Sequence, residues 1–356
     1  MPIETPDVLV IGLGPAGSRA AATAAAAGLG VVALERQKTA GAPVQCAEFV
    51  PSLIEHDVPR VRTVTEQEVT RMLTFVEAQQ PEVTDHFHGL MIDRGAFDRM
   101  LAHEAAWNGA ECRYCEPVMS VDVDGTVTTS AGTRLRPRIL IGADGPHSRV
   151  GMAIGEINRD LVDTRQVTVP LIMPHDATDI FLSPDYYGGY AWLFPKGAVA
   201  NIGLGVAFEA RRMLKSMLAA LCDKLADERR IGTVAFALTG GAIPVGGRVR
   251  SVGRLGRTAV LLTGDAAGLT NPVTGAGIAS AVQSGTLAGR AAADFLGDCS
   301  RAIEGYEEEL GDIFDAALNR ALRRRHDVLA CYAAGGRPDA RALSEGWIAS
   351  PHYWAA

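Results

Sequence analysis

The sequence is short of several features that mark particular classes of protein. No apolar run reaches the ~20 residues that a membrane-spanning helix needs. The first residues include an acidic side chain where a secretory signal peptide would be basic. The formal net charge of −7 is opposite in sign to the basic excess of nucleic-acid-binding proteins. We therefore expect a cytoplasmic protein that binds no nucleic acid, while contact with the periphery of a membrane stays open.

Cysteine is also scarce, and no cluster of metal-ligating residues stands out. The six cysteines are scattered, and one pair, Cys112 and Cys115, has the C-x-x-C spacing. The residues around this pair read as a strand, in which positions three apart point to opposite faces, so the sequence predicts no metal site. Hydrophobic residues make up 47% of the 356 positions, and this length fits about two domains.

The first sixty residues carry a dinucleotide-binding pattern. A continuous apolar run at 7–12 predicts a buried strand, and Gly12, Gly14 and Gly17 follow in the G-x-G-x-x-G spacing. An alanine-rich helix and a second strand lead to Glu35, which is placed to bind the adenosine ribose. Gly14 would let the backbone approach a pyrophosphate at the helix N-terminus. The pattern alone fits NAD or FAD. Its predicted cofactor-binding residues are Gly12, Gly14, Pro15, Ala16, Gly17, Glu35 and Arg36.

Two later motifs favour FAD. Residues 135–151 read as an apolar strand followed by Asp144 and Gly145, and residues 256–285 as a strand, a glycine-rich turn and a long helix. Both resemble the second and third fingerprints of the FAD-dependent hydroxylases and reductases, a fold family that includes para-hydroxybenzoate hydroxylase. The resemblance implies that Asp265 holds the ribityl chain of FAD and that Asp144 and Gly145 support the pyrophosphate region.

The glycine-rich turn before the long helix is predicted to lie against a planar ligand. Gly275 and Gly277 would let the backbone approach the flavin ring, and the positive end of the helix would face the ring edge that becomes negative on reduction. A plain turn is the alternative interpretation. The predicted cofactor-binding residues of this motif are Gly264, Asp265, Gly275, Ala276, Gly277 and Ile278.

A further basic residue is expected near the cofactor. Asp93 can cap a helix that begins at Arg94. In the resembled fold family a basic residue on this helix approaches the FAD phosphates, so Arg94 and Arg99 are candidates. Of the two, Arg99 is the predicted cofactor-binding residue. A solvated helix face explains either arginine equally well.

These motifs predict an α/β fold (α+β overall). It would consist of a Rossmann-like FAD-binding domain, an inserted antiparallel-sheet substrate domain and a helical C-terminal region. A basic cluster at 320–326 in that last region could complement a helix end or touch anionic lipid. The predicted segments are 1–50, 88–153 and 250–300 for the FAD-binding domain, 51–87 and 154–249 for the substrate domain, and 301–356 for the C-terminal region.

An aromatic stripe lies within the predicted substrate domain. Tyr190, Trp192 and Phe194 occupy alternate positions and would share one face of a strand. A hairpin that turns at 197–198 would place Trp192 opposite Gly203 and Tyr190 opposite Gly205. We expect a groove beside the rings that suits a long hydrocarbon, and ordinary core packing is the alternative.

This stripe carries a more specific resemblance. The pattern Y-x-W-x-F-P, completed by Pro195 and followed after seven residues by G-x-G, is similar to the signature of the geranylgeranyl reductase family. The loop at 41–51 also resembles the family's loop that carries a cysteine beside the flavin, although Ala47 replaces the usual glycine after Cys46. The resemblance implies substrate contacts for Tyr190, Trp192, Phe194, Pro195, Gly203 and Gly205, and a cofactor-binding or catalytic role for Cys46.

The expected activity is reduction of prenyl double bonds by reduced FAD. Cys46 could tune the flavin or pass a proton, or it could be a small buried filler. One alternative is a flavin monooxygenase acting on an aromatic or peptide substrate, and another is a flavoprotein that passes electrons to a quinone. The sequence contains no second nucleotide fingerprint, so transient NADPH or a ferredoxin partner would supply electrons. The expected substrate is a hydrophobic small molecule or lipid.

Overall fold

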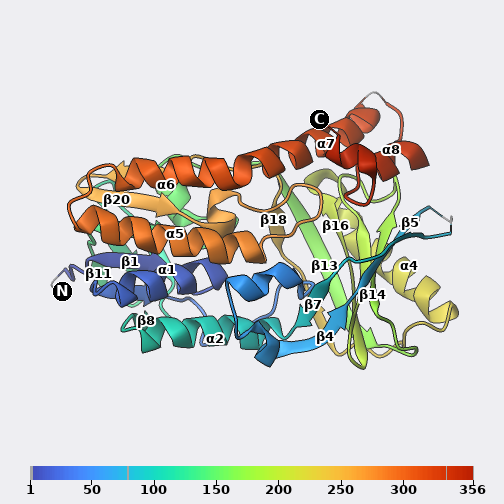
Figure 1. Ribbon diagram of the computed structural model, residues 1–356, viewed down its shortest axis with the longest axis horizontal. Coiled ribbons are helices and arrows are strands. Elements are labelled where there is room, and N and C mark those ends of the chain that lie inside the picture. The colour runs from blue at the N-terminus through green and yellow to red at the C-terminus, as the bar shows by residue number, and fades with distance from the viewer. Residues whose placement is uncertain (1–2, 78–79, 334, 356) are drawn as a thin grey trace.

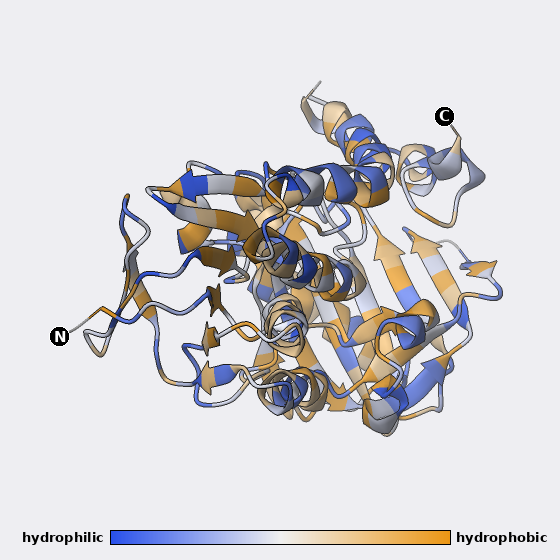
Figure 2. Ribbon diagram, turned by 60° about the vertical axis from the view of Figure 1, so that its left-hand side comes forward, coloured by the Kyte–Doolittle hydropathy of each residue, from blue (hydrophilic) through white to orange (hydrophobic). Residues whose placement is uncertain are grey.

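The computed structural model describes residues 3–77, 80–333 and 335–355. Two large sheets dominate it, one toward each end of the long axis, and a helical layer runs along one side past both (Figure 1). Hydrophobic residues are concentrated in the strands, and polar residues mark the outward faces of the helices (Figure 2). The predicted class is therefore confirmed: a Rossmann-type α/β unit, a second sheet and a helical C-terminal region.

The six-stranded sheet brings the three glycine-rich motifs together. Its inner strands are short apolar runs buried on both faces, as parallel strands covered by helices require. Because β1, β12 and β20 are parallel neighbours, the turns that follow them meet at one edge of the sheet. In spatial order the strands are β19 (Val252–Leu255), β20 (Thr258–Leu262), β12 (Ile139–Gly142), β1 (Val8–Ile11), β2 (Val31–Leu34) and β8 (Glu111–Arg113), and β19 is antiparallel to β20.

Small residues allow the two central helices to pack closely. A Cβ at Gly285 would collide with the backbone of Ala16, and one at Gly289 would collide with Thr23. α1 (Pro15–Ala26) therefore lies directly against α5 (Ile278–Leu296), which holds the first and third motifs in a fixed relation. The other helices are α2 (Arg94–Trp107), α3 (Arg149–Ala153), α4 (Leu214–Asp227), α6 (Ala302–Leu310), α7 (Ala316–Ala333), α8 (Ala340–Glu345) and α9 (Pro351–Trp354).

The eight-stranded sheet is antiparallel with one exception, because β14 and β5 run parallel. The antiparallel sheet predicted from the sequence is thus present, with this one parallel pair added. β18 (Ala242–Pro244) pairs with one end of β13. The other strands, in spatial order, are β17 (Ala237–Thr239), β13 (Leu161–Pro170), β16 (Val199–Ala207), β15 (Ala191–Lys196), β14 (Ala177–Leu182), β5 (Arg71–Val76) and β6 (Glu82–Thr84). Two smaller sheets contain β3 (Phe49–Pro51), β7 (Gly89–Ile92) and β4 (Thr65–Val69), and β11 (Arg134–Leu135), β10 (Val127–Thr129) and β9 (Val118–Val121).

The hairpin register predicted from the sequence is confirmed. β15 and β16 are antiparallel, and Trp192 is paired with Gly203. Just before β15, the carbonyl of Tyr190 accepts a 2.9 Å hydrogen bond from the N–H of Gly205. The turn falls at Gly197, whose positive φ of 63° suits a glycine.

The groove expected at Gly203 is absent from the described residues, and that expectation was wrong. A Cβ at Gly203 would lie 2.6 Å from Cε2 of Trp192, so the indole itself fills the space above the glycine. Gly205 is likewise closed off, since its Cβ would lie 2.8 Å from Val162. Glycine serves here to let a large ring and a neighbouring strand come close.

The C-terminal residues return to cover the aromatic stripe. Leu343 of α8 and Trp347 pack in the same buried cluster as Trp192 and Phe194, and the rings of Trp347 and Tyr190 are 4.8 Å apart. This long-range contact leaves Trp192 6% exposed. No pattern in the sequence predicted this contact between the C-terminal residues and the aromatic stripe.

The basic cluster at 320–326 lies in the middle of α7, and two of its arginines hold the end of the chain. Arg324 donates to the carbonyls of His352, Tyr353 and Ala355, and the guanidinium of Arg320 lies over the ring of Trp354. The side chain of Arg324 is thereby engaged within the protein. Among the described helices, none combines the length and hydropathy that a bilayer crossing requires.

The packing of Trp192 on Gly203 predicts the effect of a methyl group at this position. Gly203→Ala should lower the free energy of unfolding by about 1–3 kcal/mol, because the indole must shift within a packed core. Urea denaturation would measure this change. Gly305→Ala is the matched control: this glycine lies inside α6 with open space at its Cβ position, so the substitution should stabilise by about 0.5–1 kcal/mol. A neutral Gly203→Ala would show that the indole does not need the glycine.

Candidate active site

The first motif forms an open cradle at the start of α1. No described atom lies within 4 Å of the position that a Cβ on Gly14 would occupy, and no described side chain caps the helix N-terminus. Gly12 has a φ of 96° and touches the Ala143 backbone, while Gly17 packs against the carbonyl of Gly12. Free N–H groups and open space at a helix N-terminus suit a phosphate group.

Glu35 holds the glycine turn as well as facing the predicted ribose position. One carboxylate oxygen accepts from the N–H of Leu13 at 2.9 Å, and the other accepts from the N–H of Gln37 at 2.9 Å. The side chain is thereby fixed at the end of β2, beside the first motif. Arg36, the next residue, is exposed.

Asp144 builds its own turn rather than presenting a free carboxylate. Its two oxygens accept from the hydroxyl of Ser148 at 2.5 Å and from the N–H of Arg149 at 2.7 Å. Burial raises the pKa of this carboxyl group above its ordinary value, although these hydrogen bonds oppose the shift. Gly145, with a φ of 84°, has open space beside it. The backbone of this turn, together with Gly14, can therefore line a pyrophosphate.

Asp265 lies half-buried at the start of the third motif. Its carboxylate accepts from the hydroxyl of Thr270 at 3.1 Å, and burial raises its pKa. A Cβ on Gly277, the residue before α5, would lie 3.2 Å from the same carboxylate. Among the described residues, no side chain caps α5. A half-buried acceptor beside an uncapped 19-residue helix is suited to a ligand that carries hydroxyl groups and negative charge.

The glycine-rich turn is tied to the aromatic stripe. The hydroxyl of Tyr190 donates to the carbonyl of Thr274 at 2.6 Å, immediately before Gly275. Gly275 has a φ of 70° and Gly264 one of 59°, so both turns need glycine. Ala276 and Ile278 complete the passage from this turn into α5.

Arg94 and Arg99 lie in different surroundings. Arg94 pairs with Asp98 at 2.7 Å; burial opposes its charge, but Asp98 and the Cys46 sulfur outweigh that effect and raise its pKa. The positive charge of Arg94 also acts on Asp265, where it lowers the carboxyl pKa and so opposes the effect of burial. Arg99 is exposed and lines a cavity of about 280 Å³ with Lys38. Arg94 is thus the arginine brought beside the third motif and Cys46.

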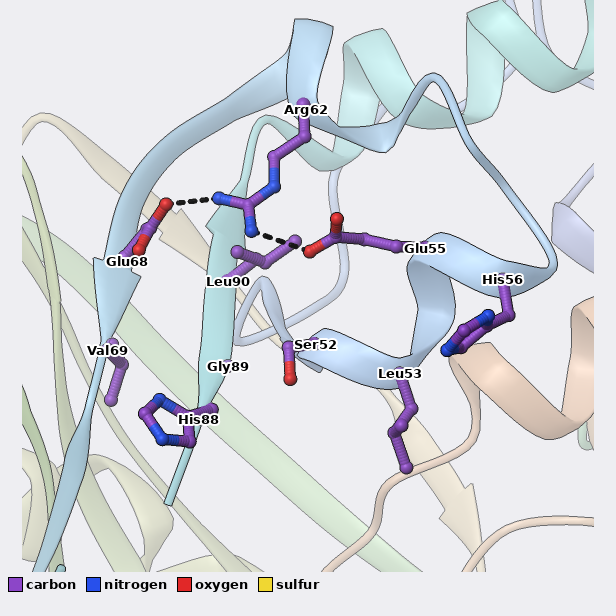
Figure 3. A pocket seen from close by; sticks show the side chains of 10 residues that line it. All are labelled: Ser52, Leu53, Glu55, His56, Arg62, Glu68, Val69, His88, Gly89 and Leu90. Carbon is purple, nitrogen blue, oxygen red and sulfur yellow. Dashed lines mark hydrogen bonds and ion pairs between the residues drawn. The ribbon is translucent and has the colours of Figure 1, made fainter. Parts of the chain in front are cut away.

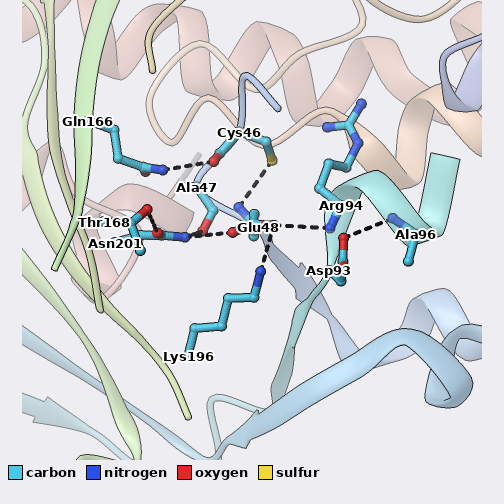
Figure 4. Close-up of polar contacts among 10 residues, drawn as sticks. All are labelled: Cys46, Ala47, Glu48, Asp93, Arg94, Ala96, Gln166, Thr168, Lys196 and Asn201. Atoms are coloured by element: carbon cyan, nitrogen blue, oxygen red, sulfur yellow. Dashed lines mark hydrogen bonds and ion pairs between the residues drawn. The ribbon is translucent and has the colours of Figure 1, made fainter. Parts of the chain in front are cut away.

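The segment from Cys46 to Glu48 is docked onto the second sheet by polar side chains (Figure 4). Gln166 bridges two parts of the site: it accepts from the indole N–H of Trp192 and donates to the carbonyl of Cys46, both at 3.0 Å. Asn201 donates to the carbonyl of Ala47 at 3.3 Å and to the carboxylate of Glu48 at 2.9 Å. The sulfur of Cys46 accepts from the N–H of Glu48 at 3.1 Å.

Sequence reasoning missed Gln166, Asn201, Glu48 and Lys196. Asn201 was open to detection, because it is paired with Phe194 and therefore faces the same side of the sheet as the stripe. Lys196 lies two residues beyond Phe194 and continues the same alternation. Glu48 offered no local signal, since its partners lie far away in the sequence.

A surface cavity of about 380 Å³ lies apart from this site, between η1 (Ser52–His56), β4 and β7 (Figure 3). Its charged groups satisfy one another, because Arg62 pairs with Glu55 at 2.7 Å and also with Glu68. Its lining does not include the residues of the aromatic stripe.

The residues present therefore fit a dinucleotide flavin. The open glycine turns and uncapped helix ends suit its phosphates, Glu35 suits its ribose, and the half-buried Asp265 suits its ribityl hydroxyls. Within the described residues, no group of three or more His, Cys, Asp or Glu is arranged to hold a metal ion.

The comparisons with known proteins point to one family. A family model described as "Geranylgeranyl reductase catalytic domain" matches residues 164–241, which contain the aromatic stripe and most of the second sheet. A digeranylgeranylglycerophospholipid reductase of Methanocella arvoryzae is 31% identical over 90% of this chain and 86% of its own length. A second such reductase, from Methanopyrus kandleri, is 33% identical over 88% of this chain and 85% of its own length.

A solved structure agrees over nearly the whole chain. The geranylgeranyl bacteriochlorophyll reductase-like protein of Thermoplasma acidophilum superimposes with a TM-score of 0.85 and 26% identity, covering 96% of this chain and 90% of the other. The similarity extends through all three glycine-rich motifs and the second sheet, because it covers both ends of the molecule.

The raised pKa of Asp265 predicts a trade of stability for binding. A raised carboxyl pKa means that the folded state holds the proton more tightly, so this group's stabilisation is lost as pH rises above the ordinary carboxyl pKa of 3.8. Apo Asp265→Asn should therefore be more stable than apo wild type at about pH 7, with the difference shrinking toward about pH 4. Its FAD content, read from flavin absorbance, should fall.

Asp124→Asn is the control with the opposite sign. A backbone hydrogen bond from Thr126 lowers the pKa of Asp124, so its contribution is present at neutral pH and is lost as pH falls. Urea unfolding at the two pH values would compare the variants. An apo Asp265→Asn protein less stable than wild type at neutral pH would contradict this assignment.

Proposed function

The chain belongs to the geranylgeranyl reductase family of FAD-dependent oxidoreductases, and from this premise we propose that it reduces double bonds in the prenyl chains of a geranylgeranyl lipid. The names of the curated relatives favour a glycerophospholipid with two geranylgeranyl chains as the substrate. The observation that carries the proposal is the match of the catalytic-domain model to the sheet that is hydrogen-bonded to the Cys46 loop and to Thr274.

The chemistry requires a hydride and a proton. Bound FAD in its reduced form supplies a hydride to one alkene carbon, while a proton adds to the other, so each double bond gains two hydrogens. An isolated alkene is a poor hydride acceptor, which makes positioning and exclusion of water important. The buried rings of Trp192 and Phe194 support such a dry surrounding.

The side chains near the site divide into those that position and those that could give a proton. The hydroxyl of Tyr190 is committed to the carbonyl of Thr274, and burial raises its pKa, so it stays protonated and holds the turn. The sulfur of Cys46 accepts from Glu48, which leaves its own S–H available to donate. We assign Cys46 as the group that passes the proton.

The proposed substrate contacts follow the stripe. The prenyl chain would lie beside Tyr190, Trp192 and Phe194, on the side of the sheet that faces the cofactor motifs. Pro195 follows Phe194 and faces the other side of the strand, so it would contribute by shaping the strand end. Gly203 and Gly205 would act indirectly, because their missing side chains let the Trp192 ring and the strand β13 close in. FAD would be held by the three glycine-rich turns together with Glu35, Asp265 and Arg94. Arg36 and Arg99, which are both exposed, would contact the solvent-facing part of the bound FAD.

The electron donor and the place of action complete the proposal. Transient NADPH or a ferredoxin would reduce the flavin, since the sequence carries one dinucleotide fingerprint. The protein would work in the cytoplasm at the periphery of a membrane, where a lipid with two long chains is available. Anaerobic reduction by NADPH, compared with reduction by reduced ferredoxin, would separate the two donors.

An anaerobic single turnover tests the proposed activity. The bound flavin is reduced, a geranylgeranyl lipid is added without oxygen, and reoxidation is followed by absorbance while the product is weighed by mass spectrometry. We expect reoxidation together with a gain of two hydrogens for each double bond reduced. A saturated phytanyl lipid is the control and should leave the flavin reduced.

Two other outcomes would point to the alternatives. A flavin that stays reduced until oxygen enters, with a hydroxylated product, would replace the proposal by monooxygenase chemistry. Reoxidation by a quinone with an unchanged prenyl lipid would instead indicate electron transfer.

A further inference from the structure

Glu48 has an unusual backbone conformation for a buried charged residue. Its φ is 70°, in the left-handed region that non-glycine residues rarely adopt, and its relative exposure is 6%. It lies two residues after Cys46 and directly before β3. A strained and buried position of this kind persists only when surrounding contacts hold it.

Those contacts come from both halves of the molecule (Figure 4). Lys196, at the end of β15, donates to one carboxylate oxygen at 2.9 Å, and the N–H of Arg94 donates to the same oxygen at 3.0 Å. Asn201 of β16 donates to the other oxygen at 2.9 Å. The carboxylate therefore joins the second sheet to the N-terminus of α2, and Lys196 neutralises its charge.

The backbone of Glu48 connects the anchored carboxylate to Cys46. Its carbonyl accepts from the N–H of Ile92 at 2.9 Å, and its N–H donates to the sulfur of Cys46 at 3.1 Å. The left-handed turn directs this N–H back toward the sulfur, and the Arg94 guanidinium also interacts with Cys46. The position of the sulfur thus depends on how the Glu48 carboxylate is paired, above all with Lys196.

We propose that Glu48, neutralised by Lys196, is a positioning residue that holds the Cys46 sulfur in place beside the flavin. The placement of Cys46 rests on the proposed function; the dependence of Cys46 on Glu48 and Lys196 does not. The two charges act as one unit. Loss of either leaves the other buried without its partner, whereas loss of both leaves a neutral, looser pair.

The test uses the FAD-bound full chain and the variants Glu48→Gln, Lys196→Met and the double variant. Alkylation of Cys46 by iodoacetamide is followed against pH by peptide mass spectrometry, which separates it from the other five cysteines. We expect each single variant to change the alkylation rate constant by about tenfold and to displace its pH profile, and the double variant to lie within about threefold of wild type.

Steady-state kinetics add a second readout. If alkene reduction is observed, Glu48→Gln should lower kcat by about tenfold with little change in KM, because the sulfur is misplaced while the lipid still binds. The visible spectrum of the bound FAD reports whether the cofactor is retained. Glu55→Gln is the matched control: Glu55 pairs with Arg62 at the separate surface cavity, so its loss should leave Cys46 unaffected.

The outcomes separate the two claims. Alkylation of Cys46 that is unchanged in both single variants, or single and double variants that differ from wild type equally, would overturn the inference. If the variants change the alkylation of Cys46 as expected but the wild-type protein reduces no prenyl lipid, the proposed function is overturned and the inference stands. Where one single variant fails to fold, the comparison of the other single variant with the double variant decides the matter, because the double variant contains no unpaired buried charge.

Discussion

The rest of the site depends on one constraint: the loop from Cys46 to Glu48 is partly buried against the second sheet, where its polar groups need hydrogen-bond partners. The second sheet supplies those partners. The side-chain amide of Gln166 donates to the carbonyl of Cys46, and that of Asn201 donates to the carbonyl of Ala47 and to one oxygen of the Glu48 carboxylate. An aliphatic face would leave these groups unpaired. The polar positions on an otherwise aromatic strand face therefore decide where the loop lies, and with it where the cysteine meets the cofactor motifs.

The aromatic stripe has a structural role that its composition does not reveal. Its rings are packed together, yet two of them end in a polar atom that contributes to a link with the cofactor-binding half, directly for Tyr190 and through Gln166 for Trp192. The hydroxyl of Tyr190 holds the turn before α5, and the indole N–H of Trp192 holds Gln166, which holds the Cys46 loop. Tyrosine and tryptophan suit this task because each combines a large apolar body with one hydrogen-bonding group. The same residues thus exclude water and set the spacing of two loops.

The cofactor-binding half carries features that cost stability in the absence of a ligand. Desolvation raises the pKa of the half-buried Asp265, and the N-termini of α1 and α5 lack side-chain caps among the described residues. These features are unfavourable for folding but favour a bound molecule with phosphates and hydroxyl groups. Asp144 shows the contrast, since its oxygens are engaged by Ser148 and Arg149 and it shapes a turn. The charge of Arg94 interacts with both Asp265 and Cys46.

The sequence by itself determined the features that local physics decides. The glycine spacing at Gly12 to Gly17 and the hairpin register of Trp192 with Gly203 follow from backbone geometry over a few residues, and both were predictable. Only the tertiary structure decided what fills the space beside the rings: the indole covers Gly203, and α8, about 150 residues later, covers the stripe. It also decided that Arg94 faces Cys46 and that Glu48 meets Lys196 and Asn201. Such contacts join residues that are far apart along the chain and leave no local pattern in the sequence. They form only when the distant segments pack together.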